Sequence, residues 1–231
     1  MIKNIIFDMD GTLADTSKVS SVALRQYAPE FGLKKLTDEK IKKAIGYANP
    51  EFYHHLFPRE DQYKLLQFAQ KVEEYEKVII KQLGDKLLFP HIMRLLHCLK
   101  ENGCKLYVAS TGSPEHVDAV LKNAGIIAMF DQIFCNKPEK ILMVKAIIND
   151  TPKKGWVMVG DKQKDSEAAQ NNNILSVGAA YGYCVPEDYN CFDFIIQEPF
   201  ELLEVLNNID LSAKTKKVLY NAILYSNFIG F

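Results

Sequence analysis

The sequence predicts an α/β fold in which helices cover a parallel β-sheet and a smaller, all-helical unit is inserted after the first strand. From about residue 85 onward, short apolar runs alternate with segments of helical periodicity, and this alternation is typical of parallel sheets. Residues 15–84 show helical periodicity alone, which predicts a separate unit. With 231 residues, the chain is long enough to bury a core without disulfide bonds.

The first strand is expected at residues 2–7. Ile5, Ile6 and Phe7 follow one another there instead of alternating with polar residues. A consecutive apolar run indicates a strand whose two faces are both buried, as in a sheet covered by helices. The strand ends at an acidic segment rich in turn-forming residues, which begins at Asp8.

Capping residues mark the helices of the inserted unit. Thr37 is expected to be an N-cap, because acidic residues follow it in the first turn. Asn49 and Pro50 are expected to be the N-cap and the first residue of another helix. An apolar stripe over residues 65–83 predicts a long helix that ends at Gly84.

Strands and helices alternate in the rest of the chain. The expected strands are residues 105–109, 132–135, 156–159, 175–177 and 194–196. Helices are expected to begin at Pro90, at Ser113-Pro114 and at Pro138, and to span residues 165–172. Residues 212–231 are predicted to form a packed C-terminal helix, with an interaction tail as the alternative.

The composition excludes several classes of protein. The net charge is −1, from 28 Lys and Arg against 29 Asp and Glu, and a dedicated nucleic-acid-binding protein would be basic. No apolar run approaches the length of a membrane span, and the apolar start of the chain is too short for a signal peptide. The 5 cysteines form no CxxC pair and indicate reduced thiols. We expect a cytoplasmic protein without nucleic-acid or membrane partners, whose oligomeric state the sequence does not reveal.

Polar residues follow the expected strands at the points where they end. Because the carboxyl ends of parallel strands meet at one edge of a sheet, these residues should lie close together. They are Asp8 and Asp10 after the first strand, Ser110 and Thr111 after the second, Lys137 after the third, and Asp161 with Asp165 after the fourth.

These residue types indicate phosphoryl transfer. Asp8, Asp10 and Asp161 cannot all stay ionised side by side without a compensating positive charge. A bound Mg²⁺ would supply it, because carboxylate oxygens are suitable ligands for this ion. Ser110 and Lys137 each precede a predicted helix N-terminus, where an anion is stabilised. An aspartate can attack phosphorus and form a covalent intermediate, while a second one exchanges a proton with the leaving group.

Four segments, in this order, resemble the motifs of the haloacid dehalogenase superfamily. Residues 8–16 (DMDGTLADT) are similar to its first motif, DxDGTLxDT, and the strand that ends at Ser110 is similar to the second. Lys137 resembles the lysine of the third motif, and residues 160–165 (GDKQKD) resemble GDxxxD, the fourth. Residues 181–183 (YGY) also resemble a segment of phosphoglycolate-phosphatase-like members.

The resemblance implies a Rossmann-like core, formed by residues 1–14 and 85–211, and a helical cap at residues 15–84. It implies that Asp8 is the nucleophile and that Asp10 is the general acid and base. It also implies that Mg²⁺ is bound by Asp8, Asp161 and the backbone carbonyl of Asp10, with an indirect or water-mediated contact from Asp165. Ser110 and Lys137 would bind the phosphoryl group. Thr111 would bind phosphate or be structural, and Thr12 would support the turn around Asp10.

Asp10 favours a phosphatase or a phosphomutase, because family members that lack the second aspartate carry out other reactions. We expect a Mg²⁺-dependent phosphatase acting on a small phosphorylated metabolite, such as phosphoglycolate, a sugar phosphate or a nucleotide. The alternatives are a sugar phosphomutase of the β-phosphoglucomutase kind and a non-catalytic binding protein on the same fold. The cap would set the substrate specificity, and residues 46–49 are expected to form the turn that faces the substrate. The histidines show no spacing typical of a metal site.

Overall fold

A six-stranded parallel β-sheet forms the centre of the computed structural model, which describes residues 2–135, 137, 139–149 and 155–209. The strands lie in the order β3-β2-β1-β4-β5-β6, which is the doubly wound Rossmann-type order, and every neighbouring pair is parallel. Their bounds are β1 (Asn4–Phe7), β2 (Lys105–Ala109), β3 (Gln132–Phe134), β4 (Trp156–Gly160), β5 (Leu175–Ala179) and β6 (Phe194–Ile196). The α/β prediction is confirmed.

Strand β1 is buried on both faces, as its consecutive apolar residues predict. Ile5 and Phe7 pack into one hydrophobic cluster and Ile6 into another, on the opposite side of the sheet. Because β1 lies between β2 and β4, the residue that follows it emerges at the point where the strand order reverses. Open α/β sheets bind their ligands at this place.

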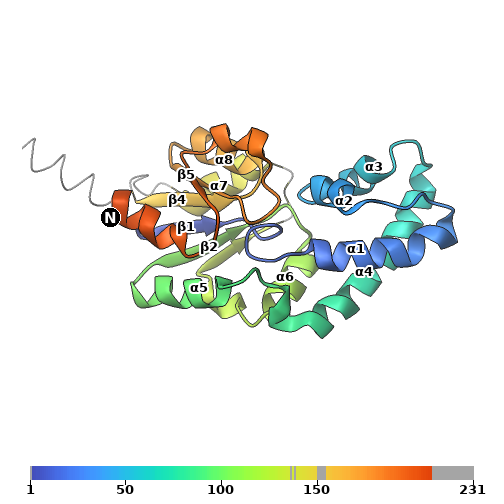
Figure 1. The fold of residues 1–231 in the computed structure, drawn as a ribbon, viewed down its shortest axis with the longest axis horizontal. Helices are drawn as coiled ribbons and strands as arrows, with labels where there is room; N and C mark the ends of the chain where they lie inside the picture. The colour runs from blue at the N-terminus through green and yellow to red at the C-terminus, as the bar shows by residue number, and fades with distance from the viewer. Residues whose placement is uncertain (1, 136, 138, 150–154, 210–231) are drawn as a thin grey trace, which may run out of the picture.

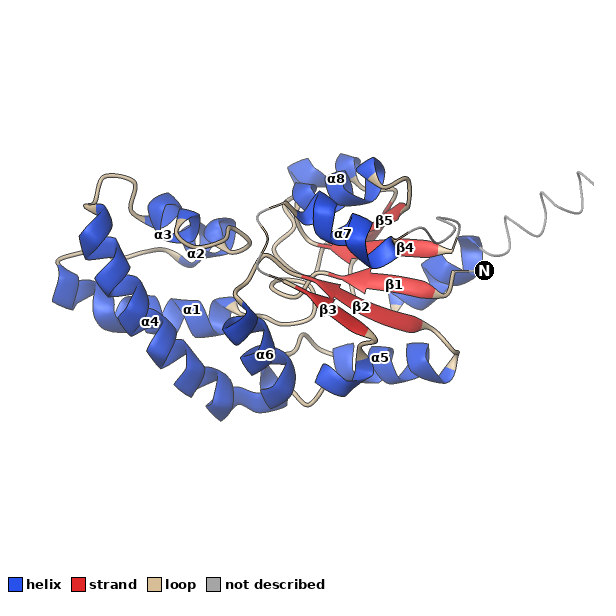
Figure 2. Ribbon diagram, turned by 180° about the vertical axis from the view of Figure 1, so that it is seen from behind, coloured by secondary structure: helices blue, strands red, loops and turns tan. Residues whose placement is uncertain are grey.

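Helices cover both faces of the sheet (Figure 2). Helices α7 (Lys140–Ile148) and α8 (Gln163–Asn171) lie on one face, and α5 (Ile92–Glu101) and α6 (Pro114–Asn123) lie on the other. Residues 201–209 are also helical. The N-cap of α6 is Ser113, as predicted, and its side chain accepts a hydrogen bond from the amide of His116 (3.2 Å).

Two of these helices begin later than the sequence predicts. Helix α5 begins at Ile92 and not at Pro90, because His91 has a left-handed backbone conformation with a φ of 69°. Helix α7 begins at Lys140, and Pro138 lies outside the described residues.

The inserted unit contains helices α1 (Ser17–Tyr27), α2 (Asp38–Ala44), α3 (Glu51–Leu56) and α4 (Gln62–Leu83), which lie together beside the sheet (Figure 1). We call residues 15–84 the cap. Thr37 caps α2 by accepting a hydrogen bond from the amide of Lys40 (3.2 Å), and Gly84 ends α4, both as predicted. Helix α3 begins at Glu51, one residue after Pro50, and the side chain of Asn49 donates to Glu73 (2.6 Å) instead of capping α3.

Aromatic rings pack together inside the cap. The ring of Phe68 on α4 is surrounded edge to face by Phe31, Tyr53 and Phe57, with centroid distances of 5.4, 5.9 and 5.6 Å. Such pairs add to the free energy gained by burying the rings. Phe68, Tyr53 and Phe57 belong to the same hydrophobic cluster as Ile5 and Phe7 of β1, so the packing of the cap is continuous with one face of the sheet.

The two linkers between cap and core run side by side. The amide of Asp15 donates to the carbonyl of Leu87 (2.8 Å), and the amide of Phe89 donates to the carbonyl of Leu13 (3.1 Å). The chain thus leaves the core and returns to it at a single place, directly beyond the loop that follows β1.

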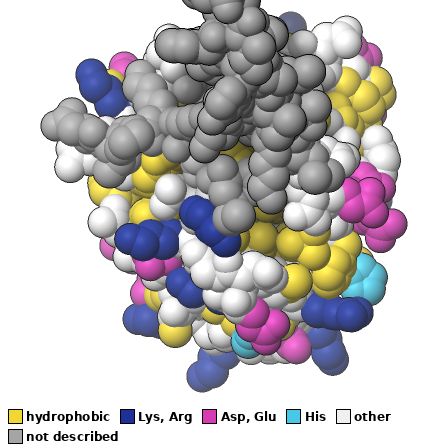
Figure 3. Space-filling model, turned by 90° about the vertical axis from the view of Figure 1, so that its left-hand side faces the viewer, with side chains coloured by type: hydrophobic (Ala, Val, Ile, Leu, Met, Phe, Trp, Pro, Cys, Tyr) yellow, Lys and Arg dark blue, Asp and Glu magenta, His cyan; other side chains and the backbone are white. Residues whose placement is uncertain are grey.

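No described helix is long and apolar enough to cross a membrane. On the face opposite the cap, acidic and basic side chains are both scattered among hydrophobic ones where described side chains are visible (Figure 3). The segment expected to form a C-terminal helix or tail, residues 212–231, lies outside the described residues.

Candidate active site

The loop after β1 is wound tightly around one carbonyl group. The carbonyl of Met9 accepts hydrogen bonds from the amides of Thr12 (3.2 Å), Leu13 (2.9 Å) and Ala14 (3.0 Å). Gly11 has a φ of 86°, and a Cβ at this position would lie 2.4 Å from Oδ2 of Asp161. Only glycine fits there, because the loop brings its backbone directly against the carboxylate that follows β4.

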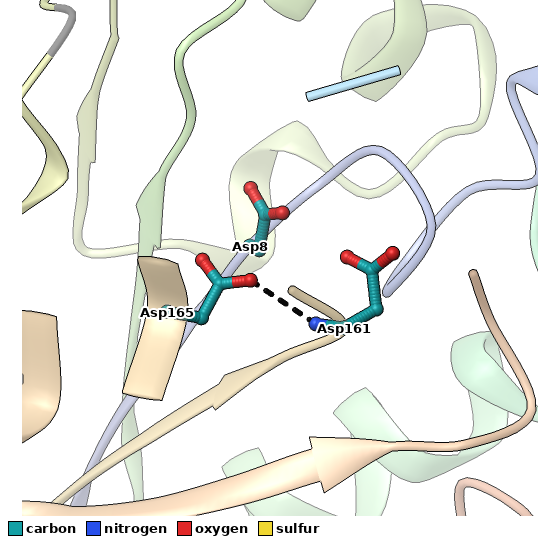
Figure 4. A group of neighbouring side chains, drawn as sticks. All are labelled: Asp8, Asp161 and Asp165. Carbon is teal, nitrogen blue, oxygen red and sulfur yellow. Dashed lines mark hydrogen bonds between the residues drawn. The ribbon is translucent and has the colours of Figure 1, made fainter. Parts of the chain in front are cut away.

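Three buried carboxylates meet at the carboxyl ends of β1 and β4. Asp8, Asp161 and Asp165 each bring one carboxylate oxygen within 4.8 Å of the others (Figure 4). Oδ2 of Asp165 accepts hydrogen bonds from the backbone amides of Asp161 (3.1 Å) and Lys162 (2.9 Å). Asp165 therefore holds the loop that carries Asp161, and its Oδ2 is already satisfied.

Lys140, at the start of α7, joins two of these carboxylates. Its Nζ lies 2.7 Å from Oδ1 of Asp8 and 2.5 Å from Oδ1 of Asp165, and its side chain is almost completely buried. Burial alone would lower the pKa of Lys140, but the charges of Asp165 and Asp8 raise it above its usual value. Lys140 is therefore a permanent cation in the site.

Lys137, which was expected to bind the phosphoryl group, is not the lysine that contacts these carboxylates, and its role stays a prediction. Lys137 is exposed, and Lys140, three residues later, forms the ion pairs with the carboxylates. The reason is that α7 begins at Lys140, so that this side chain shares the buried face of the helix with Met143, Val144 and Ile147. That i, i+3, i+4, i+7 spacing is the signal in the sequence that distinguishes the two lysines.

The remaining carboxylate oxygens fit a divalent cation. Burial raises the pKa of Asp8 to about 6 against the effect of Lys140, and burial together with the charges of Asp8 and Asp165 raises the pKa of Asp161 well above its usual range. Thr12 donates to Oδ1 of Asp161 (3.3 Å), whereas Oδ2 has no hydrogen-bond partner in the described part of the chain. A bound divalent metal ion would satisfy this oxygen and lower the repulsion between the carboxylates.

Asp10 is paired with a histidine that the sequence did not reveal as functional. Nε2 of His116, in the first turn of α6, lies 3.0 Å from Oδ1 of Asp10. Although burial opposes it, the charge of Asp10 raises the pKa of His116 to about 9, and the imidazolium lowers the pKa of Asp10. Near neutral pH the pair is therefore an imidazolium and a carboxylate, with one exchangeable proton stored beside Asp10.

The His116–Asp10 pair predicts a pH-dependent free energy of unfolding. Because the pKa of His116 rises on folding from 6.5 to about 9, its stabilising effect is complete below pH 6.5 and is lost as the pH rises through about 9. We expect the difference in stability between wild type and His116→Asn to shrink by roughly 1–3 kcal/mol over this range. Urea unfolding in EDTA measures it, with His97→Asn, an exposed histidine on α5, as control. A difference that stays constant with pH would contradict the pairing.

The residues after β2 divide between core and cap. Ser110 is buried at the same sheet edge as Asp8, and its Oγ accepts a hydrogen bond from the amide of Gly112 (3.1 Å). The hydroxyl of Thr111 instead donates to the carbonyl of Gly46 in the cap (2.9 Å), and Lys164 on α8 contacts both partners. Of the two readings left open for Thr111, these contacts favour the structural one.

A cavity of about 390 Å³ lies between cap and core beside Asp10. The turn at residues 46–49, expected to face the substrate, lines it from the cap, and His116 lines it from the core. Asp10 lines this cavity, whereas Asp8, Asp161 and Asp165 do not, because the side chain of Asp10 points toward His116 on α6.

The chain matches a family model described as haloacid dehalogenase-like hydrolase over residues 5–179. It is 26% identical over 219 residues to a phosphoglycolate phosphatase of Synechococcus elongatus, covering 89% of this chain and 97% of that protein. It is 27% identical over 222 residues to the pyrophosphatase PpaX of Listeria monocytogenes, covering 90% and 97%.

Solved structures share the fold. A haloacid dehalogenase-like hydrolase from Streptococcus pneumoniae superposes with a TM-score of 0.76 at 24% identity, covering 89% of this chain and 98% of that one. A β-phosphoglucomutase from Clostridium difficile superposes with a TM-score of 0.74 at 22% identity, covering 92% and 100%.

Proposed function

Because this chain belongs to the haloacid dehalogenase-like hydrolase family, we propose that it is a Mg²⁺-dependent phosphatase that hydrolyses a small phosphomonoester through an aspartyl-phosphate on Asp8. The observation that carries this proposal is the arrangement around β1. Asp8 is held by a buried lysine beside Asp161, while Asp10, two residues later, is held by His116 in the lining of a cavity.

The first step forms the covalent intermediate. Lys140 binds Oδ1 of Asp8, so that Oδ2 is the oxygen that attacks phosphorus. As the new O–P bond forms, the bond between phosphorus and the alcohol oxygen of the substrate breaks. Asp10, which takes the stored proton from His116, gives it to that oxygen, and the alcohol leaves.

The second step returns the enzyme to its starting state. Asp10, now a carboxylate, accepts a proton from a water molecule, and the resulting hydroxide attacks the phosphorus of the intermediate. The bond between phosphorus and Asp8 breaks and inorganic phosphate is released. Asp10 passes the proton from water to His116, which restores the imidazolium–carboxylate pair for another cycle. Lys140 lowers the negative charge that the phosphoryl group meets beside Asp8 and Asp165.

Mg²⁺ would be held by Asp8, Asp161 and the backbone carbonyl of Asp10. When bound, it neutralises charge on the phosphoryl oxygens and on the carboxylates themselves. Ser110, at the same sheet edge, would donate a hydrogen bond to a phosphoryl oxygen. Asp165 positions Asp161 through the backbone of its loop.

Phosphate release from a panel of phosphoesters, measured with Mg²⁺ and with EDTA, tests the proposal. We expect release from at least one compound with Mg²⁺ and none with EDTA, in a panel of phosphoglycolate, sugar phosphates, nucleoside monophosphates and pyrophosphate. Mg²⁺ should also raise the Tm of the wild type, since it binds the folded state, but not that of Asp161→Asn. Isomerisation of a sugar phosphate without net release would identify a phosphomutase instead, and binding without turnover would identify a non-catalytic protein.

A further inference from the structure

The cavity between cap and core is the place for the leaving group of the substrate. Asp10 lines this cavity, and in the proposed reaction Asp10 gives its proton to the oxygen of the leaving alcohol. The rest of the alcohol must therefore extend from Asp10 into the cavity. The charges and hydrogen-bonding groups of its lining then decide which alcohols fit.

The charges of this lining are unbalanced. Besides Asp10, three carboxylates line the cavity, Glu73 and Glu76 from α4 and Glu115 from α6. The cations of the lining are Lys77 and His116, and His116 is already paired with Asp10. Three carboxylates thus face one lysine.

The two glutamates of α4 are held by neutral groups. Glu76, which is buried, accepts a hydrogen bond from the hydroxyl of Ser20 (2.7 Å), and Glu73 accepts one from the side-chain amide of Asn49 (2.6 Å). Among the described side chains, neither has a lysine or arginine nitrogen within 4.0 Å. Burial raises the pKa of both. The charge of His116 opposes this for both glutamates, and that of Lys77 opposes it for Glu73, but neither cation reverses the shift.

One further polar group in the lining is only weakly held. The hydroxyl of Thr16, almost completely buried at the start of α1, borders the cavity. Within the described residues, no group forms a hydrogen bond of normal geometry with it, although the hydroxyl is close enough to Asp10 to help lower the pKa of that carboxyl. A buried hydroxyl in this state is available to a ligand that fills the cavity.

We propose that this cavity selects phosphomonoesters whose alcohol carries an ammonium group, and that it disfavours alcohols that carry a second anion. The proposal rests on the phosphatase function given above. An ammonium would lie among Glu73, Glu76 and Glu115 and would offset their charge, whereas a carboxylate would add a further anion to a space where carboxylates already outnumber cations. The volume of about 390 Å³ limits the alcohol to a small one.

Three phosphomonoesters of similar size but different charge test this preference. They are phosphoethanolamine, with an ammonium, 2-hydroxyethyl phosphate, with a neutral hydroxyl, and phosphoglycolate, with a carboxylate. We expect kcat/KM, measured with Mg²⁺ near neutral pH, to fall in that order, by about tenfold or more from the ammonium to the carboxylate.

Glu73→Gln should lower the ratio of kcat/KM for phosphoethanolamine to kcat/KM for phosphoglycolate, because it removes one of the unbalanced charges with little change in volume. Glu74→Gln is the matched control, since Glu74 is the next residue on α4 but is exposed and does not line the cavity. It should leave the ratio as it is in the wild type.

The outcomes separate the preference from the phosphatase function. If the protein releases phosphate from p-nitrophenyl phosphate but prefers phosphoglycolate, treats all three esters alike, or hydrolyses none of the three, the selection of an ammonium is overturned and the phosphatase function stands. If no phosphoester is hydrolysed with Mg²⁺, the phosphatase function fails, and the preference fails with it.

Discussion

Asp8→Asn is expected to reduce Mg²⁺-dependent phosphate release by about 10⁴-fold or more, because the amide cannot form the covalent phosphoryl intermediate. Asparagine has the same shape as aspartate and removes one of three crowded carboxylates, so the variant should remain folded. Phosphate release measures the loss, and mass spectrometry of wild type quenched during turnover should detect a phosphoryl adduct on Asp8 that the variant lacks.

Asp118→Asn is the control for this substitution. Asp118 lies on α6, its side chain is exposed, and among the described ion pairs it pairs only with Lys122. The Asp118→Asn variant should therefore release phosphate at the rate of the wild type. If Asp8→Asn instead retained the rate of the wild type, water would attack the substrate directly, and Asp8 would serve only as a ligand.

Lys140→Met is expected to affect stability and catalysis together. The substitution leaves Asp8 and Asp165 buried without their shared cation, and removing one partner from a buried ion pair typically costs about 3–5 kcal/mol. The loss should be larger above pH 6, where the carboxylate of Asp8 is ionised, than in acid, where Asp8 can take up a proton. Phosphate release should fall by roughly 10²-fold or more, since the charge beside the nucleophile is lost.

Lys137→Met is the matched variant for comparison with Lys140→Met, because it makes the same change three residues earlier at an exposed position. Its free energy of unfolding should stay within about 0.5 kcal/mol of the wild type, with activity retained. Urea unfolding and phosphate release of both variants decide the matter. Loss of activity in Lys137→Met together with a stable, active Lys140→Met would return the role to Lys137.

Local signals in the sequence were sufficient for most of the fold. The consecutive apolar residues of β1 predict a strand buried on both faces, and Thr37 and Ser113 cap helices where expected. These features depend on neighbouring residues alone, so that a single sequence contains them. The positions of Asp8, Asp161 and Asp165 at one sheet edge also follow, because parallel strands bring their ends together.

Contacts between distant elements could not be read from the sequence. Thr111 stands next to Ser110, yet its hydroxyl binds the carbonyl of Gly46 because the cap turn lies against it. His116 reaches Asp10 only because α6 starts at the same edge as the loop after β1. The choice between Lys137 and Lys140 depended on the exact residue at which α7 begins, and helix boundaries are the least certain part of any pattern.

The paired linkers of the cap have a consequence for how such an enzyme changes over generations. Asp15 and Phe89 are hydrogen-bonded to the opposite linker, so both ends of the inserted segment are tied to each other before they reach the sheet. A different helical insert could take this place as one continuous stretch of coding sequence, without moving Asp8, Lys140 or Asp161. The catalytic residues would then be unchanged while the substrates that the enzyme accepts would differ.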